Sequence, residues 1–223
     1  MPIDTTPPAS PSVTIPAEVL ELLQSRLSTG RRFLLGLVGA PGSGKSTLAR
    51  ALCEHAGSAA QLVPMDGYHL ANVQLQRLGR AQRKGAPDTF DSHGYVSLLR
   101  RLREPEAGVT VYAPDFRREI EEPIANAIAV EPQVPLIVTE GNYLLMDEPG
   151  WCDVRGLLDE VWYVEEDESL RLQRLIARHE EFGRAADAAR RWVAQTDEPN
   201  ARRIEATRSR AHRVFRWGTG FVG

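Results

Sequence analysis

Residues 39–46 read GAPGSGKS and match the phosphate-binding pattern G-x-x-x-x-G-K-[ST] at every fixed position. Glycines at these spacings let backbone N–H groups curl round phosphate oxygens, and a helix that begins directly afterwards adds its dipole. The Lys45 ammonium is expected to reach the terminal phosphates, the Ser46 hydroxyl to ligate Mg²⁺, and Thr47 to contact an inner phosphate. The motif thus predicts a nucleoside triphosphate site made of Gly39, Ala40, Pro41, Gly42, Ser43, Gly44, Lys45, Ser46 and Thr47.

Two carboxylates follow other apolar stretches. Asp66 comes after QLVPM, and Glu140 comes after PLIVT. A kinase needs one carboxylate to position or deprotonate the acceptor hydroxyl, and its Mg²⁺ needs oxygen ligands. Asp66 is the candidate for the first role, and Glu140 with Ser46 is the candidate for the second. Either carboxylate could instead begin a turn or cap a helix.

Cations that screen a moving phosphoryl group are the third requirement of a kinase. Basic charge in this chain is almost all arginine, and Lys45 and Lys84 are its two lysines. Arg171, Arg174 and Arg178 recur at i, i+3 and i+7, which places them on one face of a predicted helix. We expect Arg174 and Arg178 first, and Arg171 next, to close over the phosphates. The alternative is an ordinary solvated basic face.

Other classes of nucleotide-binding protein are less well supported. The sequence contains no N-K-x-D or T-K-x-D pattern for reading guanine. Its D-x-x-G match, DVRG at 153–156, follows no apolar strand, so a GTP-dependent switch is disfavoured. Two alternatives stay open. One is a kinase whose acceptor is itself a nucleotide, with Arg83 and Arg117 on the acceptor phosphate. The other is a non-catalytic ATP-binding regulator.

Composition narrows the class further. The chain has 223 residues, 42% of them hydrophobic, which suits one compact α/β domain. A formal net charge of −3 disfavours a general nucleic-acid binder. No apolar run approaches the roughly 20 residues that span a bilayer, so no membrane partner is expected. Two cysteines, Cys53 and Cys152, suggest no disulfide framework, and a cytoplasmic location is expected.

The elements that must position these residues follow from apolar spacing and from glycine and proline. Residues 1–15 are expected to form a disordered tail, and 16–223 a single domain. Strands are predicted at 31–40, 61–67, 109–114, 135–141 and 159–165. Helices are predicted at 16–29, 45–57, 69–80 and 92–104, with Ser92 as a helix N-cap.

Two segments are harder to assign. Residues 116–133 are ambiguous, because their prolines argue against one long helix. Residues 167–213 are predicted to be helical with breaks near Gly183 and Pro199, and 167–200 to form a lid. Strands that alternate with helices and are apolar on both faces indicate a three-layer α/β fold with a parallel sheet of about five strands and a helical lid. Ligands bind such sheets at the carboxyl ends of the strands, so the phosphate loop, Asp66 and Glu140 should converge there.

The stretch 66–91, DGYHLANVQLQRLGRAQRKGAPDTFD, resembles bacterial type I pantothenate kinases. It looks more like their shorter relatives, the P-loop proteins labelled fructose transport system kinases or nucleoside/nucleotide kinases. Uridine kinase and phosphoribulokinase are similar at lower resolution. The resemblance continues through VYAPDF to LIVTEGNYLL and covers most of the chain between about 36 and 146.

This resemblance implies a P-loop NTPase fold and an ATP-dependent kinase of small metabolites, which moves the γ-phosphoryl group to a hydroxyl of a sugar, nucleoside or pantothenate-like alcohol. It implies that Asp66 is the catalytic base and that Glu140 helps to bind Mg²⁺. It also admits a homodimer, and it leaves the acceptor open. The candidate acceptor contacts are Tyr68, His69, Arg83, Lys84, Asp91, Asp115, Arg117 and Tyr143, with Arg118 and Asn142 beside them.

Overall fold

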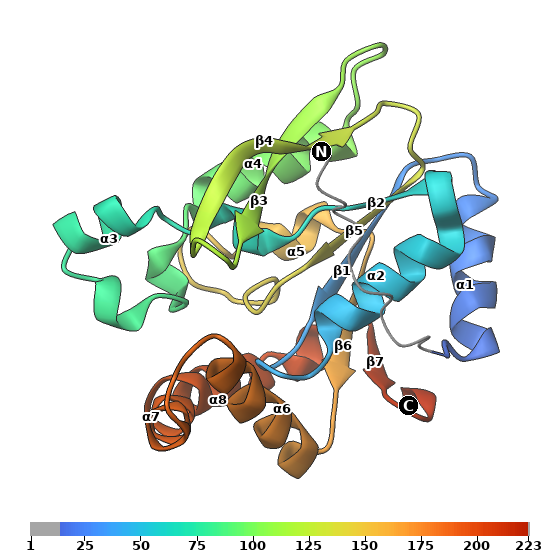
Figure 1. The fold of residues 1–223 in the computed structure, drawn as a ribbon. Helices are drawn as coiled ribbons and strands as arrows, with labels where there is room; N and C mark the ends of the chain where they lie inside the picture. Colours follow the sequence, from blue (N-terminus) through green and yellow to red (C-terminus); the bar gives the residue numbers. More distant parts are fainter. Residues whose placement is uncertain (1–13, 223) are drawn as a thin grey trace, which may run out of the picture.

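The central sheet has six strands in the order β2-β5-β1-β6-β7-β8 (Figure 1). The structure, a computed structural model, describes residues 14–222, so most of the expected tail lies outside the described residues. The first five strands of this order run parallel, which confirms the predicted sheet type, and β8 is antiparallel to β7. Four of the five parallel strands were predicted; the fifth is β7, and the strand predicted at 109–114 lies outside this sheet. The strands are β1 (Phe33–Val38), β2 (Ala60–Leu62), β5 (Leu136–Glu140), β6 (Glu160–Glu165), β7 (Arg213–Arg216) and β8 (Gly220–Val222).

Helices cover both faces of this sheet and so form the three expected layers. One face packs against α1 and α2, and the other packs against α4, α5 and α8. Within residues 14–222, no helix combines the length and the apolar character that crossing a bilayer needs. The helices are α1 (Ala17–Leu27), α2 (Lys45–Ala56), α3 (Asn72–Arg77), α4 (Ser92–Arg103), α5 (Val154–Leu157), α6 (Glu168–Glu181), α7 (Ala186–Trp192) and α8 (Glu198–Glu205).

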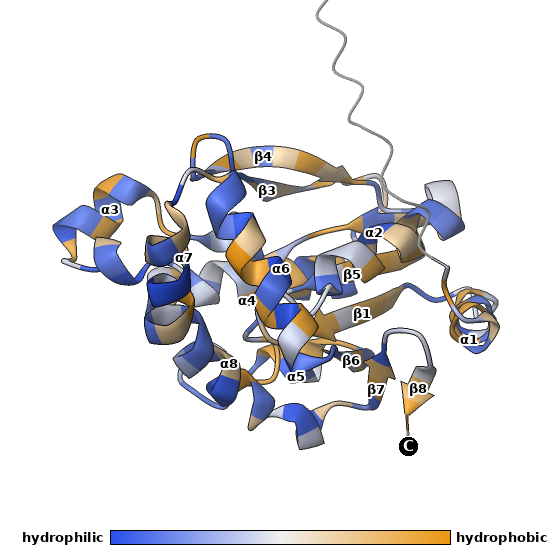
Figure 2. Cartoon of the chain, turned by 60° about the horizontal axis from the view of Figure 1, so that its bottom comes forward, coloured by the Kyte–Doolittle hydropathy of each residue, from blue (hydrophilic) through white to orange (hydrophobic). Residues whose placement is uncertain are grey.

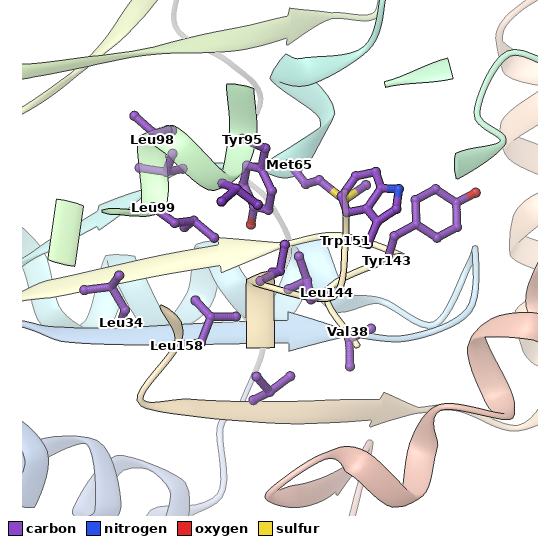
Figure 3. Packing of buried hydrophobic residues seen from close by; sticks show 14 of the residues in the cluster. Leu34, Val38, Met65, Tyr95, Leu98, Leu99, Tyr143, Leu144, Trp151 and Leu158 are labelled. Atoms are coloured by element: carbon purple, nitrogen blue, oxygen red, sulfur yellow. The ribbon is translucent and has the colours of Figure 1, made fainter. Parts of the chain in front are cut away.

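Strand β1 lies at the centre, and all of its residues are buried. Because side chains alternate along a strand, Leu35 and Leu37 enter the core under α1 and α2, whereas Leu34 and Val38 enter the core under α4. Figure 3 shows the second core, with side chains of α4 above the strands. Each such fully buried leucine contributes about 1.5–3 kcal/mol. The peripheral helices α3 and α7 differ from these hydrophobic strands, because most of their residues are hydrophilic (Figure 2).

A separate β-hairpin stands outside the sheet. Strand β3 (Val111–Arg117) includes most of the strand predicted at 109–114. Its partner β4 (Glu122–Val130) comes from the segment that the sequence left ambiguous, and the two strands are antiparallel. The hairpin packs against the turn Met65–Tyr68, where a Cβ on Gly67 would lie 2.3 Å from the carbonyl oxygen of Pro114. This contact brings the tip of the hairpin next to Asp66.

Three predicted boundaries were wrong. The strand predicted at 61–67 ends at Leu62, and Asp66 lies in a 3₁₀ turn that follows Pro64. The helix predicted at 69–80 is reduced to α3, which covers only its middle. The N-cap of α4 is Asp91 and not Ser92, because the Asp91 carboxylate accepts the Gly94 N–H at 2.9 Å.

The C-terminal third differs more from its prediction. Helix α6 breaks at Gly183, whose φ is 89°, as expected. Pro199 causes no break, because it lies in the first turn of α8, where a missing N–H costs little. The π-turn Val193–Asp197 joins α7 to α8. Residues from Arg213 onward form β7 and β8, which the sequence analysis missed although Gly218 and Gly220 mark their turn.

Glu160, at the start of β6, ties three elements together. Its carboxylate accepts hydrogen bonds from Arg26 Nε of α1 at 3.0 Å and from Trp162 Nε1 at 2.8 Å. It also accepts one from Arg213 Nε of β7 at 3.3 Å. Burial alone raises the pKa of Glu160, but the hydrogen bonds from Trp162 and Arg26 outweigh burial and leave the pKa below its usual value. The ionised form therefore stabilises the fold.

We expect Glu160→Gln to lower the free energy of unfolding at neutral pH by about 1–3 kcal/mol, because charged hydrogen bonds are lost. The pKa of Glu160 is lower in the folded protein than in the unfolded chain. The stabilisation is therefore complete well above the ordinary value of 4.5 and disappears as the pH falls through the folded value. Urea unfolding from neutral pH down to about pH 3 would measure this. A difference between variant and wild type that stays constant with pH contradicts the prediction.

Candidate active site

Residues 39–44 form the turn between β1 and α2, and Lys45 and Ser46 are the first residues of α2, as the motif predicts. Gly42 and Gly44 have φ values of 84° and 85°, in the left-handed region that favours glycine. The Trp217 indole donates a hydrogen bond to the Ser43 carbonyl at 2.8 Å. A Cβ on Gly44 would approach Trp217 Nε1 to 2.7 Å. Backbone conformation and packing therefore both require glycine at position 44, and α2 begins directly after it at Lys45.

Lys45, Ser46 and Glu140 form one polar group at the ends of β1 and β5. The Ser46 hydroxyl donates to Glu140 Oε1 at 2.8 Å. Burial lowers the pKa of Lys45, and Glu140 and Asp66 offset part of this effect. Burial likewise raises the pKa of Glu140, and Lys45 offsets part of that. Burial thus destabilises the charged form of each group, and the opposite charge of the other group compensates part of this effect. Such perturbed pairs of titratable groups are typical of functional sites.

The chemistry of this group fits Mg²⁺. The ion prefers six oxygen ligands and keeps several waters, so one or two protein oxygens beside a phosphate site are enough. The Ser46 hydroxyl and the Glu140 carboxylate already lie within hydrogen-bond distance of each other, next to the phosphate loop. Glu140 is also 6% exposed, so its carboxylate is held in place by its surroundings.

Asp66 is fixed by its neighbours on both sides. Its carbonyl accepts the backbone N–H of His69 at 3.1 Å and the ring Nδ1–H of His69 at 2.8 Å. Its carboxylate lies 3.4 Å from Arg118 of the hairpin tip. The same carboxylate is near enough to Lys45 and Glu140 to affect the pKa of both. Asp66 therefore faces the phosphate loop from the opposite wall of the crevice.

His69 acts as a brace for this turn. Its ring lies between Phe90, at a centroid distance of 4.0 Å, and Phe116, at 4.6 Å. Burial lowers the pKa of His69, so the ring is neutral near neutral pH. Because Nδ1 donates to the Asp66 carbonyl, Nε2 carries no proton and can accept a hydrogen bond.

Two cavities meet at this crevice. The phosphate-loop cavity, about 520 Å³, is lined by Gly44, Thr47, Arg174 and Trp217 among others. The hairpin cavity, about 540 Å³, is lined by Asp66, His69, Lys84, Asn142 and Arg184 among others. Four residues line both cavities, namely Lys45, Ser46, Arg118 and Arg178. Molecules that fill the two cavities would therefore meet among three cations and a hydroxyl.

The three arginines of α6 have three different environments. Arg171 is buried, and it donates to the Pro41 carbonyl at 3.2 Å and to Glu198 of α8 at 2.6 Å. Arg174 lines the phosphate-loop cavity and pairs with Glu166 at 2.5 Å. The side chain of Arg178 has no hydrogen-bond or ion-pair partner within residues 14–222.

Arg178 is also the one of these three α6 arginines that lines both cavities. Burial, and then the neighbouring Arg118, lowers the pKa of Arg178. The guanidinium groups of Arg178 and Arg118 are close together, and two neighbouring guanidinium groups favour the binding of an anion. Arg171 instead connects the phosphate loop to α8. The helical spacing of the three arginines therefore did not predict which of them faces the cavities.

Of the expected acceptor contacts, His69 and Lys84 line the hairpin cavity. Lys84 is occupied: its ammonium donates to Asn72 Oδ1 at 2.8 Å and to the Glu121 carbonyl. It therefore ties α3 to the hairpin tip. Asn142 lines the same cavity, and its buried Oδ1 has no hydrogen-bond partner in the described part of the chain.

The other expected contacts are not brought to either cavity. Tyr68 packs edge-on against Tyr95, and Tyr143 is fully buried with its hydroxyl donating to the Gly85 carbonyl. Asp91 caps α4. The remaining three form surface ion pairs, Arg83 with Asp88 at 2.6 Å and Arg117 with Asp115 at 3.4 Å. Arg118, and not its neighbour Arg117, lines the two cavities. The sequence could not distinguish the two arginines, because the conformation of the hairpin decides which one points inward.

A parallel sheet with a phosphate loop after its central strand, and carboxylates beside that loop, defines a P-loop nucleotide-binding protein. The chain belongs to the phosphoribulokinase/uridine kinase family, which matches over residues 34–219. Phosphoryl transfer from a nucleotide is therefore the general class of its activity.

Named relatives and solved structures agree with this membership. The crystal structure of a "putative fructose transport system kinase" from Silicibacter sp. TM1040 has a TM-score of 0.80 and 39% identity, covering 90% of this chain and 98% of the other. A "putative uridine kinase" of Schizosaccharomyces pombe is 36% identical over 179 residues, 76% of each chain. The pantothenate kinase of Clavibacter michiganensis is 32% identical over 216 residues, 82% of this chain and 66% of that one.

The different surroundings of Arg171 and Arg178 predict opposite effects on stability. We expect Arg171→Gln to cost about 1–3 kcal/mol, because it removes charged hydrogen bonds and leaves Glu198 unpaired. At about 2–4 °C per kcal/mol, thermal unfolding without ligands should show the loss clearly. Arg178→Gln should leave the melting temperature unchanged or raise it, because it removes an unpaired, partly desolvated charge. Arg202→Gln, on the exposed side of α8, is the control, and equal losses for Arg171 and Arg178 contradict the prediction.

Proposed function

We propose that this protein transfers the γ-phosphoryl group of ATP to a hydroxyl group of a small metabolite, with Mg²⁺ required. The observation that carries the proposal is the junction of the two cavities at Lys45, Ser46, Arg118 and Arg178. ATP in the phosphate-loop cavity would place its last phosphate at this junction. An acceptor in the hairpin cavity would then have its hydroxyl between that phosphate and Asp66.

The reaction in this arrangement needs one proton transfer and one displacement. The acceptor oxygen forms a bond to the γ-phosphorus, the bond from phosphorus to the bridging oxygen of ADP breaks, and the hydroxyl proton passes to the Asp66 carboxylate. Lys45, Arg118 and Arg178 stabilise the charge on the moving group. One donor of this kind is worth roughly 10²–10³ in rate. The His69 brace holds Asp66 in place for its role.

Ser46 and Glu140 are the residues that would hold Mg²⁺. When bound, the ion would draw negative charge from the phosphate oxygens. Glu140 keeps a second role without the ion, because it compensates the buried ammonium of Lys45.

We further propose that 167–200 act as a lid within one domain spanning 16–223. Residues from α6, the α6–α7 turn and the π-turn line the hairpin cavity, among them Arg178, Arg184 and Asp197. A lid that closes over both ligands would exclude water from the phosphoryl group. Arg171 would couple the lid to the phosphate loop through the Pro41 carbonyl.

The relatives carry the names of different kinases, so the acceptor is not transferred from any of them. A nucleotide acceptor loses its expected support, because Arg83 and Arg117 form surface ion pairs outside the cavities. A non-catalytic ATP-binding regulator is the remaining alternative. It would keep its function when Asp66 is changed, whereas a kinase would not.

We expect Asp66→Asn to retain ATP binding and to lower acceptor-stimulated ADP release by about 10²–10⁴-fold, because the proton acceptor is lost. The measurement is a coupled ADP assay with pantothenate, uridine, cytidine, fructose and other sugars, alongside calorimetric titration with ATP. Asp115→Asn is the matched control, since Asp115 lies nearby and pairs with Arg117 outside the cavities. A variant at Asp66 that keeps most of its rate would exclude the assigned role.

Ser46→Ala should raise the Mg²⁺ concentration for half-maximal ADP release by on the order of 10–100-fold. Glu140→Gln should do the same and should in addition weaken ATP binding, because Lys45 loses its buried partner. The assay is ADP release as a function of Mg²⁺ at saturating ATP. An unchanged Mg²⁺ dependence in both variants would rule out these two oxygens as ligands.

A further inference from the structure

The hairpin cavity contains a cation that the reaction at Asp66 does not use. Arg184 lines this cavity but not the phosphate-loop cavity. It directly follows Gly183, whose φ of 89° reverses the chain at the end of α6. The backbone N–H of Arg184 donates to the His179 carbonyl at 3.0 Å, so the turn that carries it is closed by a hydrogen bond.

The Arg184 guanidinium is oriented by an aromatic ring. Its Cζ lies 3.8 Å from the centroid of the Trp192 ring, which is stacking distance. Stacking uses the face of the guanidinium and leaves the N–H donors at its edge free, in a planar fork that suits carboxylate or phosphate oxygens. No side-chain hydrogen bond or ion pair of Arg184 occurs within residues 14–222. The donors are therefore positioned and unused.

The charges around Arg184 are mostly compensated by one another. Asp66 pairs with Arg118 at 3.4 Å, and Glu121 lies 3.7 Å from Lys84. Burial raises the pKa of Asp197, and a hydrogen bond with His179 at 2.8 Å together with the nearby Arg178 and Arg184 offsets part of this effect. Across the described lining of the hairpin cavity, this leaves Lys45, Arg178 and Arg184 as cations and Glu119 as an acid without an ion-pair partner. Glu140 lies close to Lys45 but is not part of this lining.

These remaining charges divide by position. Lys45 offsets Glu140, and both Lys45 and Arg178 border the phosphate-loop cavity, where the transferred phosphate would use them. Glu119 is exposed on the hairpin tip. Arg184 is exposed as well, and it alone among these cations lines the hairpin cavity without lining the phosphate-loop cavity. Asp197 is near Arg184, but the two form no ion pair within residues 14–222, so the donors of Arg184 remain available to an anion.

We propose that the acceptor carries an anionic group, a carboxylate or a phosphate monoester, which Arg184 binds while the reacting hydroxyl lies against Asp66. This inference rests on the proposed function and adds the chemical class of its substrate. Arg184 thereby becomes a binding residue on the lid, so an anionic acceptor also draws the α6–α7 turn over the cavity.

The test compares related acceptors with and without an anionic group. The pairs are glycerate with glycerol, pantothenate with pantothenyl alcohol, and fructose 1-phosphate with fructose, so carboxylate and phosphate are separate arms. Coupled ADP release gives kcat and KM for wild type, for Arg184→Gln and for Arg202→Gln, an exposed arginine of α8 that lines neither cavity. We expect the anionic member to be preferred, and Arg184→Gln to raise its KM at least about tenfold. The kcat and the KM for ATP should change by less than about twofold.

A binding measurement covers the case in which none of these acceptors is turned over. Protein filled with Mg²⁺ and a non-hydrolysable ATP analogue is titrated calorimetrically with inorganic phosphate and with acetate. Binding of either anion that weakens at least about tenfold in Arg184→Gln, but not in Arg202→Gln, supports the anionic subsite.

The outcomes separate this inference from the proposed function. Neutral and charged acceptors used equally well, with no effect of Arg184→Gln, would overturn the inference and leave the kinase intact. Anion binding that depends on Arg184 without any acceptor turnover would support the subsite and count against the kinase. Absence of both turnover and Arg184-dependent binding would overturn both.

Discussion

The register between β1 and β5 is the constraint on which the site depends. Leu37 pairs with Glu140, and the Gly141 N–H donates to the Leu37 carbonyl at 3.0 Å, so the Glu140 strand end lies beside the phosphate loop. A shift by one residue would turn Glu140 to the other face of the sheet. Alternate burial of β1 side chains in two cores prevents such a shift. The hydrophobic core thus determines where the Glu140 carboxylate lies.

The hairpin side of the crevice is built differently, from segments that are distant in the chain. The turn of Asp66 is wedged against the hairpin at Gly67 and braced by His69, and the hairpin tip is tied to α3 through Lys84. A compact ammonium with three donors suits this junction of carbonyl oxygens better than a planar guanidinium, which explains a lysine in an arginine-rich chain. Packing and polar contacts together hold Arg118 over Asp66.

Helix α6 shows how one repeating pattern produces unlike roles. Arg171, Arg174 and Arg178 share a helix face, yet one braces the phosphate loop and one pairs with Glu166. The third lines both cavities and has no partner among the residues that the structure describes. Their neighbours come from α8, the β6–α6 connection and the hairpin. Since an arginine's role depends on what faces it, the helical spacing predicted the group and could not predict its members' functions.

The sequence by itself determined the phosphate loop, helices α1, α2, α4 and α6, four of the five parallel strands in outline, and the pairing of Asp66 and Glu140 with that loop. These features depend on local spacing and on the rule that parallel strands end at one edge. Only the tertiary structure decided the hairpin, strands β7 and β8, and the entry of Arg118 and Arg184 into the cavity. The physical reason is that these features depend on register and contacts between segments far apart in the chain, such as β7 against β6 and Pro114 against Gly67. Local sequence does not encode such contacts.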